Sequence, residues 1–292
     1  MSTPAAEVEI DETLIRRLLR EQHPDLAEQS IEIQDSGWDN VMARLGEDLA
    51  VRLPRREIAA ELLRNEQRWL PRLAPGLPLP VPAPKRVGTP TAAYPFPWSV
   101  LGWLPGTTAD LEPPDVDQAE VLADFLRAVH QPAPADAPRN PHRDRPLSSK
   151  DEAHRDRLKK LEERGEAVPP LVDELWARAL ATPIDVPKTW IAGDIHARNV
   201  LVQNGKISAF IDWGDLCEGD RATDLASIWA LFSDAEARRC ALERYAPTPS
   251  TLDRARGWAA FYGVILLQTG LEDFPAHVPM ARKVLAGLEE GE

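Results

Sequence analysis

Cysteine is nearly absent from this sequence of 292 residues. The two cysteines, Cys217 and Cys240, belong to no CxxC or Cys/His motif, which excludes a disulfide framework and a zinc site. No apolar run approaches the roughly 18 to 20 residues that span a bilayer, so we expect no membrane partner. The first 15 residues lack the basic and apolar regions of a secretory signal, and we therefore expect a protein of the reducing cytoplasm.

Basic residues are also in deficit. The chain has 34 Lys and Arg against 47 Asp and Glu, a net charge of −13. Nucleic-acid binding depends on clustered Lys and Arg and is not expected, whereas cationic partners are more natural. Hydrophobic residues, at 43%, are as frequent as in ordinary globular proteins. At roughly 150 residues per domain, the length predicts two domains or one bilobal unit.

The first third of the chain alternates short strands with helices. Its patterns predict helices over 11–20 and 57–73 and strands over 30–34, 40–45, 48–53, 85–88 and 97–103. The proline-rich segment 74–84 is expected to be an extended connector. Leu104-Pro105-Gly106 ends the last strand, so we place a lobe boundary there, between residues 1–104 and 105–292.

The second part is predicted to be mostly helical. Helical periodicity covers 117–130, 150–164, 171–181, 220–232, 234–245, 252–269 and 279–288. Segment 131–146, rich in proline and charge, is expected to be a surface loop, with a disordered insertion as the alternative. A small hairpin, 200–202 with 207–211, turns at Asn204-Gly205. The predicted fold class is α+β, with a small N-terminal sheet lobe and a larger helical C-terminal lobe.

Three polar residues flank this hairpin on loops: Asp194, Asn199 and Asp212. An Asp that orients a hydroxyl, an Asn five residues later and a second Asp after the next strand are what phosphoryl transfer requires. Carboxylate and carboxamide oxygens are also the ligands that Mg²⁺ prefers. Asp and Asn are common turn residues, so the prediction depends on their combination.

Here the chain resembles the aminoglycoside phosphotransferase family of antibiotic kinases, relatives of the protein kinases. The family pattern His-Gly-Asp-Leu-His-x-x-Asn, then Ile-Asp-Trp/Phe-Gly-Asp and Gly-Asp-Pro-x-x-Asp-Leu-Ala, corresponds to residues 192–199, 211–215 and 219–226. The resemblance implies a bilobal protein-kinase-like fold, with a nucleotide-binding lobe at 1–104 and a catalytic and substrate-binding lobe at 105–292. It also implies that Asp194 is catalytic, and that Asn199 and Asp212 are catalytic residues that ligate Mg²⁺.

The resemblance further implies that residues 1–104 bind the phosphoryl donor, ATP or GTP. Ser36 and Gly37 stand at the phosphate-covering loop, with a plain hairpin turn as the alternative. Arg52 replaces the family lysine, in Val-Arg-Leu-Pro-Arg-Arg, which resembles the Arg-Ile-Pro-Arg-Arg of the macrolide phosphotransferase branch. Its planar fork can clamp phosphate oxygens in a different geometry. Glu66 is the expected partner of Arg52, with Glu61 as the other candidate.

One further departure from the family pattern and the two hinge residues complete the implied site. Ala192 stands where the family has a histidine, which removes a side chain that supports the catalytic loop. Trp103 and Leu104 occupy the hinge, where their backbone groups would meet the nucleotide base, although their side chains could simply belong to the core.

The acceptor is expected to bind residues 105–292, which carry most of the acidity. Their net charge is −10, against −3 for residues 1–104, and an acidic cleft concentrates a cationic acceptor such as an aminoglycoside. We expect Asp215, Glu272 and Asp273 to face the substrate. Against this stand the macrolide-like Arg52 segment and five aromatic residues that either line an apolar pocket or form core: Trp229, Phe232, Trp258, Phe261 and Tyr262.

The predicted function is therefore a Mg²⁺-dependent kinase of a hydroxyl on a small molecule, an antibiotic aminoglycoside or macrolide, whose phosphorylation confers resistance. A kinase of another hydroxylated metabolite and a regulatory nucleotide-binding pseudokinase are the alternatives.

Overall fold

The computed structural model describes residues 6–36 and 39–290, which divide into two compact units. Unit 1 comprises the described residues of 1–76, 80–104 and 212–214, and unit 2 comprises those of 77–79, 105–211 and 215–292. The chain leaves unit 1 after Leu104, where the sequence analysis places the lobe boundary. The roles assigned to 1–104 and 105–292 stay predictions.

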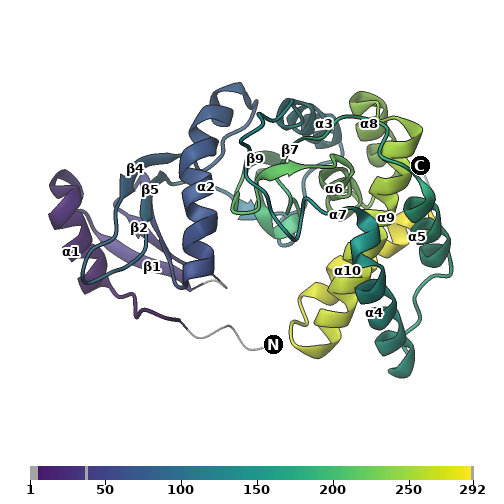
Figure 1. The fold of residues 1–292 in the computed structure, drawn as a ribbon, viewed down its shortest axis with the longest axis horizontal. Coiled ribbons are helices and arrows are strands. Elements are labelled where there is room, and N and C mark those ends of the chain that lie inside the picture. The colour runs from purple at the N-terminus through teal and green to yellow at the C-terminus, as the bar shows by residue number, and fades with distance from the viewer. Residues whose placement is uncertain (1–5, 37–38, 291–292) are drawn as a thin grey trace. The chain divides into compact units, whose positions relative to one another are not determined.

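Unit 1 is built on a five-stranded antiparallel sheet of order β1-β2-β3-β5-β4. The strands are β1 (Ile31–Ser36), β2 (Asn40–Leu45), β3 (Leu49–Pro54), β4 (Pro84–Gly88) and β5 (Trp98–Gly102). Two helices, α1 (Glu12–Gln22) and α2 (Glu57–Leu73), complete the unit, with short 3-10 turns at η1 (Pro24–Leu26) and η2 (Ala74–Gly76). Helix α2 packs against β3, β4 and β5 (Figure 1).

The core of unit 1 follows from the helical and alternating patterns. The carboxylate of Asp11 caps α1 by accepting the amide of Leu14 at 2.7 Å, and the apolar face of this helix packs with inward-facing strand residues. Gly88 is required by packing, because a Cβ there would lie 1.9 Å from Cε2 of the buried Trp98.

Unit 2 is mainly helical. Its helices are α3 (Gln118–Val129), α4 (Asp151–Glu163), α5 (Leu171–Ala181), α6 (Ala222–Leu225), α7 (Ser227–Leu231), α8 (Ala235–Tyr245), α9 (Pro249–Glu272) and α10 (His277–Glu289), with 3-10 turns η3 (Leu147–Lys150) and η4 (Ala197–Asn199). Helix α9 packs against α5 and α10, and α3 packs against α8 (Figure 1). No helix in the described part of the chain is both long and apolar enough to cross a membrane.

Two small sheets hold the loops of unit 2. β6 (Thr107–Thr108), β8 (Val200–Gln203) and β9 (Lys206–Phe210) form one sheet, and β7 (Thr189–Ile191) pairs with β10 (Cys217–Gly219) in the other. The hairpin of β8 and β9 turns at Asn204 and Gly205, both at positive φ, as the dipeptide predicts. The pairing of β7 with β10 was not predicted, because three-residue strands carry no periodic pattern.

The predicted α+β class, with a small antiparallel sheet lobe and a larger helical part, is confirmed. One predicted helix, 220–232, is wrong: it is the two short helices α6 and α7. The predicted end of helix 252–269 is also wrong, since α9 continues to Glu272. Segment 131–146 contains no helix or strand, as expected of a loop.

The aromatic residues of unit 2 belong to its core. Trp229, Phe232, Trp258 and Phe261 are at most 6% exposed, which favours the core interpretation over an apolar pocket. Tyr262, which is half-buried, instead reaches a polar network described below.

Candidate active site

A buried carboxylate binds the backbone of the loop that carries Asp194. Asp224 of α6, 1% exposed, accepts the amide of Ala192 on Oδ2 at 2.7 Å and the amide of Gly193 on Oδ1 at 2.8 Å. Gly193 has a φ of +86°, and a Cβ there would lie 2.9 Å from the carbonyl oxygen of Asp215, so this turn requires glycine. The backbone before Asp194 is therefore positioned by α6.

Arg143, from the loop 131–146, binds the side chain of Asp194. Its Nη2 donates to Oδ1 of Asp194 at 2.6 Å, and its Nε donates to Oδ2 of Asp215 at 2.8 Å. Its Nη1 donates to the hydroxyl of Tyr262 on α9 at 3.2 Å. The arginine side chain is 19% exposed. One guanidinium thus ties together two carboxylates and one helix.

Asp215 has both of its carboxylate oxygens engaged by this loop. Oδ1 accepts the side-chain amide of the buried Asn140 at 2.7 Å, while Oδ2 takes Arg143. Asp215, which the sequence predicts to face the substrate, is thus the second carboxylate bound by Arg143.

Charge keeps Asp194 ionised. Burial opposes ionisation, but the charge of Arg143 and the imidazole of His196, 3.5 Å from Oδ2, outweigh it and lower the pKa of Asp194 to about 2. Arg143 thus binds Oδ1 of Asp194, whereas Oδ2 has the imidazole of His196 at 3.5 Å.

The side-chain nitrogen of Asn199 fixes the orientation of its carboxamide group. Its Nδ2 donates to the carbonyl oxygen of Asp194 at 3.0 Å and lies 3.2 Å from Nε2 of His196. The amide nitrogen is thereby used within the loop, so the carboxamide oxygen is the atom left for a cation. His196 also accepts the amide of Arg198 on Nδ1 at 3.2 Å, which makes it a supporting residue of the loop.

Unit 1 contains the predicted arginine pair. Arg52 on β3 donates from Nη1 to Oε2 of Glu66 on α2 at 2.6 Å and from Nη2 to Oδ1 of Asp212 at 3.1 Å. Arg52 and Glu66 are 8% and 1% exposed at their side chains, whereas Asp212 is 56% exposed. Glu61, the other candidate partner, is exposed.

Burial decides the electrostatics of this pair. It raises the pKa of Glu66 despite the adjacent Arg52, while the pKa of Arg52 is raised because its carboxylate partners outweigh the effect of burial. Asp212 adopts a φ of +58°, a left-handed conformation that is uncommon for a residue with a side chain and that often marks a functional position.

Trp103 and Leu104, predicted to meet the nucleotide base, follow β5 in unit 1. The amide of Trp103 donates to the carbonyl oxygen of Asp48 at 2.8 Å, so it is not available to a base in this structure. The indole of Trp103 lies under Arg44, 5.0 Å from its guanidinium carbon. Leu104 ends the second segment of unit 1. Ser36 ends β1, but its side chain and Gly37 lie outside the described residues.

The two other predicted acceptor carboxylates lie at the end of α9. Glu272 is in the last turn of this helix, a correction to its expected place after the helix, and accepts Nη2 of Arg164 at 2.9 Å. Gln268 also donates to it at 2.6 Å. Asp273 is the C-cap, whose amide donates to Thr269.

Sequence reasoning missed Arg143 and Asn140. Both lie in segment 131–146, whose proline and charge content indicated only a loop. The charged Asp194 and Asp215 offered one signal, since two partly buried carboxylates so close together require a cation, but the sequence does not say which of many arginines supplies it.

A model of the phosphotransferase enzyme family (APH) matches residues 30–258, which is most of the chain.

Solved structures share the fold over nearly all of both chains. The GDP complex of wild-type aminoglycoside 2'-phosphotransferase-IIIa covers 96% of this chain and 99% of its own, with a TM-score of 0.65 and 17% identity. The macrolide 2'-phosphotransferase MphH from Brachybacterium faecium, as apoenzyme, covers 93% and 97%, with a TM-score of 0.59 and 22% identity. The streptomycin-ATP complex of APH(2")-IIa covers 98% of each, with a TM-score of 0.59 and 15% identity.

Proposed function

Because this chain belongs to the phosphotransferase enzyme family, we propose that it transfers the γ-phosphoryl group of ATP or GTP to a hydroxyl of an antibiotic. The family match confirms the resemblance found in the motifs and the prediction of a phosphotransferase. The donor, the acceptor and the roles of individual residues are proposals, argued below from the contacts within each unit.

The observation that carries the proposal is the state of Asp194. Its carboxylate is ionised, one oxygen is fixed by Arg143, and its backbone is fixed by Asp224 and Asn199. In this role Oδ2 accepts the hydrogen of the acceptor hydroxyl and aims the hydroxyl oxygen at the phosphorus. A pKa of about 2 makes the carboxylate a weak base, so its main contribution is orientation, as a loose phosphoryl-transfer transition state requires.

The phosphoryl donor would be held by Arg52 and, through Mg²⁺, by Asn199 and Asp212. Arg52, fixed by Glu66, would bind phosphate oxygens through its guanidinium. Asn199 and Asp212 have oxygen atoms of the kind that Mg²⁺ prefers. Asn199 would use its carboxamide oxygen, because its side-chain nitrogen binds within the loop, and Asp212 would use its exposed carboxylate. When bound, Mg²⁺ neutralises phosphate charge.

Similar structures support a nucleotide donor without deciding its base. The aminoglycoside 2'-phosphotransferase-IIIa carries GDP, whereas the APH(2")-IIa complex carries ATP. We propose that either ATP or GTP serves as the phosphoryl donor. We also propose that the protein acts in the cytoplasm, as the sequence predicts.

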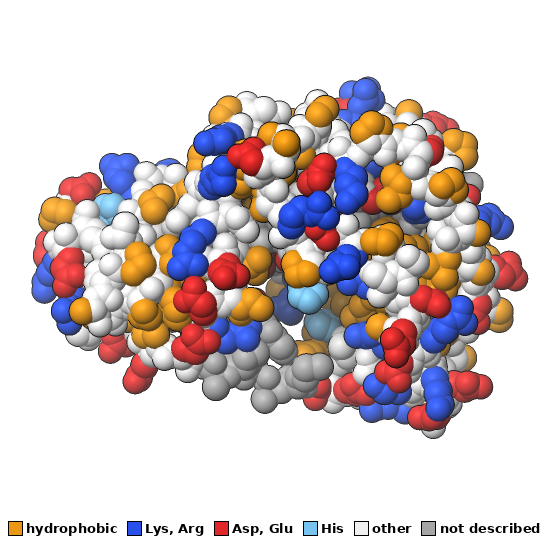
Figure 2. Space-filling model, viewed as in Figure 1, with side chains coloured by type: hydrophobic (Ala, Val, Ile, Leu, Met, Phe, Trp, Pro, Cys, Tyr) orange, Lys and Arg blue, Asp and Glu red, His pale blue; other side chains and the backbone are white. Residues whose placement is uncertain are grey.

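The contacts favour a macrolide acceptor over a polycationic aminoglycoside. Two of the three carboxylates expected to attract a cation have an arginine partner inside unit 2: Asp215 shares Arg143 with Asp194, and Glu272 pairs with Arg164. On the face shown in Figure 2, acidic and basic side chains are interspersed and form no tract of one sign. On this face, therefore, the negative charge is not gathered into a surface for a polycation.

The test is an acceptor panel. The purified protein with Mg²⁺ is incubated with ATP or GTP and with macrolides, aminoglycosides and small polyols, and products are identified by mass spectrometry. We expect a macrolide product heavier by one phosphoryl group, and a raised inhibitory concentration of that macrolide in a host expressing the gene. Transfer to another metabolite would refute the antibiotic acceptor, and nucleotide binding without any transfer would support the pseudokinase.

A further inference from the structure

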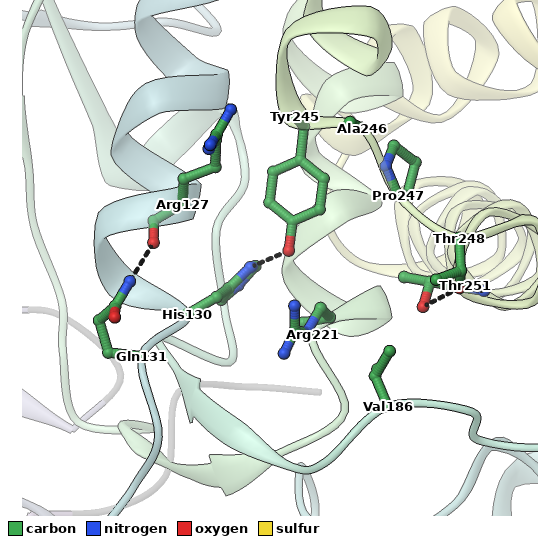
Figure 3. Close-up of a pocket in the computed structure, with 10 residues that line it drawn as sticks. All are labelled: Arg127, His130, Gln131, Val186, Arg221, Tyr245, Ala246, Pro247, Thr248 and Thr251. Atoms are coloured by element: carbon green, nitrogen blue, oxygen red, sulfur yellow. Dashed lines mark hydrogen bonds between the residues drawn. The ribbon is translucent and has the colours of Figure 1, made fainter.

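A cavity of about 350 Å³ in unit 2 lies outside the proposed catalytic and nucleotide sites. It is formed where the end of α3 and the start of α9 meet α6 and α8. Figure 3 shows Arg127, His130, Arg221, Tyr245 and Thr248 among the side chains around it. The proposed reaction uses none of these residues, although Arg221 lies within the motif segment 219–226, at the place of the family proline.

The cavity has an excess of positive charge. In the described part of the chain, neither Arg127 nor Arg221 lies within ion-pair distance of a carboxylate, and Nε of Arg221 is buried without a hydrogen-bond partner. The carboxylates nearest to Arg221 in sequence are committed elsewhere. Asp220 accepts Nε of Arg254 at 2.6 Å, and Asp224 holds two backbone amides of the catalytic loop.

The nearby hydroxyl does not remove this charge. Burial raises the pKa of Tyr245 to about 12, although the charge and proximity of Arg221 favour its ionisation. Tyr245 is therefore neutral at physiological pH and supplies no negative charge to balance Arg221. A partly buried guanidinium of this kind is stabilised by an anion that supplies several acceptor oxygens.

A short chain of contacts joins the cavity to the catalytic loop. The hydroxyl of Tyr245 lies 2.7 Å from Nδ1 of His130, and Nε2 of His130 lies 3.2 Å from Oδ2 of Asp224. That same oxygen accepts the amide of Ala192 at 2.7 Å. His130, Tyr245 and Asp224 are all at most 7% exposed, so a change in the position of Tyr245 is transmitted through packed groups.

We propose that this cavity binds a small anion of the phosphate class, and that its occupancy stabilises the backbone of the catalytic loop. The two positive charges of the guanidinium groups match the two negative charges of a phosphate dianion. A single carboxylate would balance only one of them. Arg221 is the principal ligand and Arg127 is the cation at the rim. The bound anion fixes Arg221 beside Tyr245, and the contacts through His130 and Asp224 carry that constraint to the amides of Ala192 and Gly193.

The experiment uses inorganic phosphate as the probe and the full chain. Phosphate is titrated by calorimetry at constant ionic strength, with acetate as the carboxylate comparison, and amide hydrogen exchange is followed in the peptide that contains Ala192 and Gly193. The variants are Arg221→Gln and Arg221→Lys. Arg239→Gln, an exposed arginine of α8 that pairs with Glu236 and Glu243, is the matched control. Near-ultraviolet circular dichroism checks that each variant is folded.

We expect phosphate to bind the unaltered protein more tightly than acetate and to slow exchange at Ala192 and Gly193. Arg221→Gln weakens phosphate binding at least about tenfold and abolishes the slowing, Arg221→Lys retains part of both, and Arg239→Gln changes neither. Equal phosphate binding by the unaltered protein and folded Arg221→Gln would overturn the site, as would acetate binding as tight as that of phosphate. Phosphate binding with unchanged exchange would overturn the coupling. None of these readouts requires catalytic activity.

Discussion

Replacing Arg143 by glutamine removes the single cation that separates two carboxylates. Arg143 lies 2.6 Å from Oδ1 of Asp194 and 2.8 Å from Oδ2 of Asp215, and the three side chains are 19%, 29% and 23% exposed. Loss of one partner of a fully buried pair costs about 3 to 5 kcal/mol, whereas an exposed pair is worth no more than about 1 kcal/mol. For these partly buried groups we expect the free energy of unfolding to fall by about 2 to 3 kcal/mol.

Urea unfolding followed by tryptophan fluorescence measures this loss. Arg244→Gln is the control, because it breaks a bidentate pair with Asp124 that is about half exposed, and it should cost at most about 1 kcal/mol. Adding Asp215→Asn to Arg143→Gln removes one of the two repelling charges and should recover about 1 kcal/mol. Equal losses in Arg143→Gln and Arg244→Gln, or no recovery in the double variant, would refute the reasoning.

Three further predictions concern other buried contacts. Burial lowers the pKa of His154 from 6.5 to about 4. Between these pH values the unfolded chain binds more protons than the folded chain, so the free energy of unfolding falls by roughly 2 to 3 kcal/mol as the pH drops through that window. His154→Phe should therefore reduce the pH dependence of the urea unfolding midpoint between pH 7 and pH 4. Asp224→Asn turns one acceptor into a donor facing the amide of Ala192 or Gly193, and should lower kcat more than tenfold with an unchanged Kd for nucleotide; unchanged kcat would show that this anchor is not needed. Gly88→Ala places a methyl group 1.9 Å from Trp98. It should reduce the free energy of unfolding by about 1 to 3 kcal/mol and so lower the thermal midpoint, whereas an unchanged midpoint would contradict that packing.

Local patterns carried much of the fold because they are repeated along each element. The alternation in β2 and the apolar face of α1 appear directly in the burial of those elements, whereas β3 is buried at every position after Leu49. The pairing of Arg52 with Glu66 was also predictable, since it joins two elements whose order the family motif specifies.

Contacts between distant parts of the chain were not predictable in the same way. Arg143 reaches Asp194 across 51 positions from a loop that has no periodicity, and several other arginines could have taken its place. The end of α9 was underestimated because Gly270 interrupts the favourable helix sequence, although tight packing against Val278 accommodates that glycine.

The central claim is that Asp194 orients the acceptor hydroxyl for phosphoryl transfer. Single-turnover transfer to the acceptor identified by the panel tests it, with Asp194→Asn compared with Asp124→Asn, a surface aspartate of α3. The account predicts that Asp194→Asn lowers the transfer rate at least about 100-fold while the Kd for nucleotide changes little, and that Asp124→Asn has no effect. A folded Asp194→Asn variant that transfers phosphate within a few-fold of the unaltered rate would contradict the account.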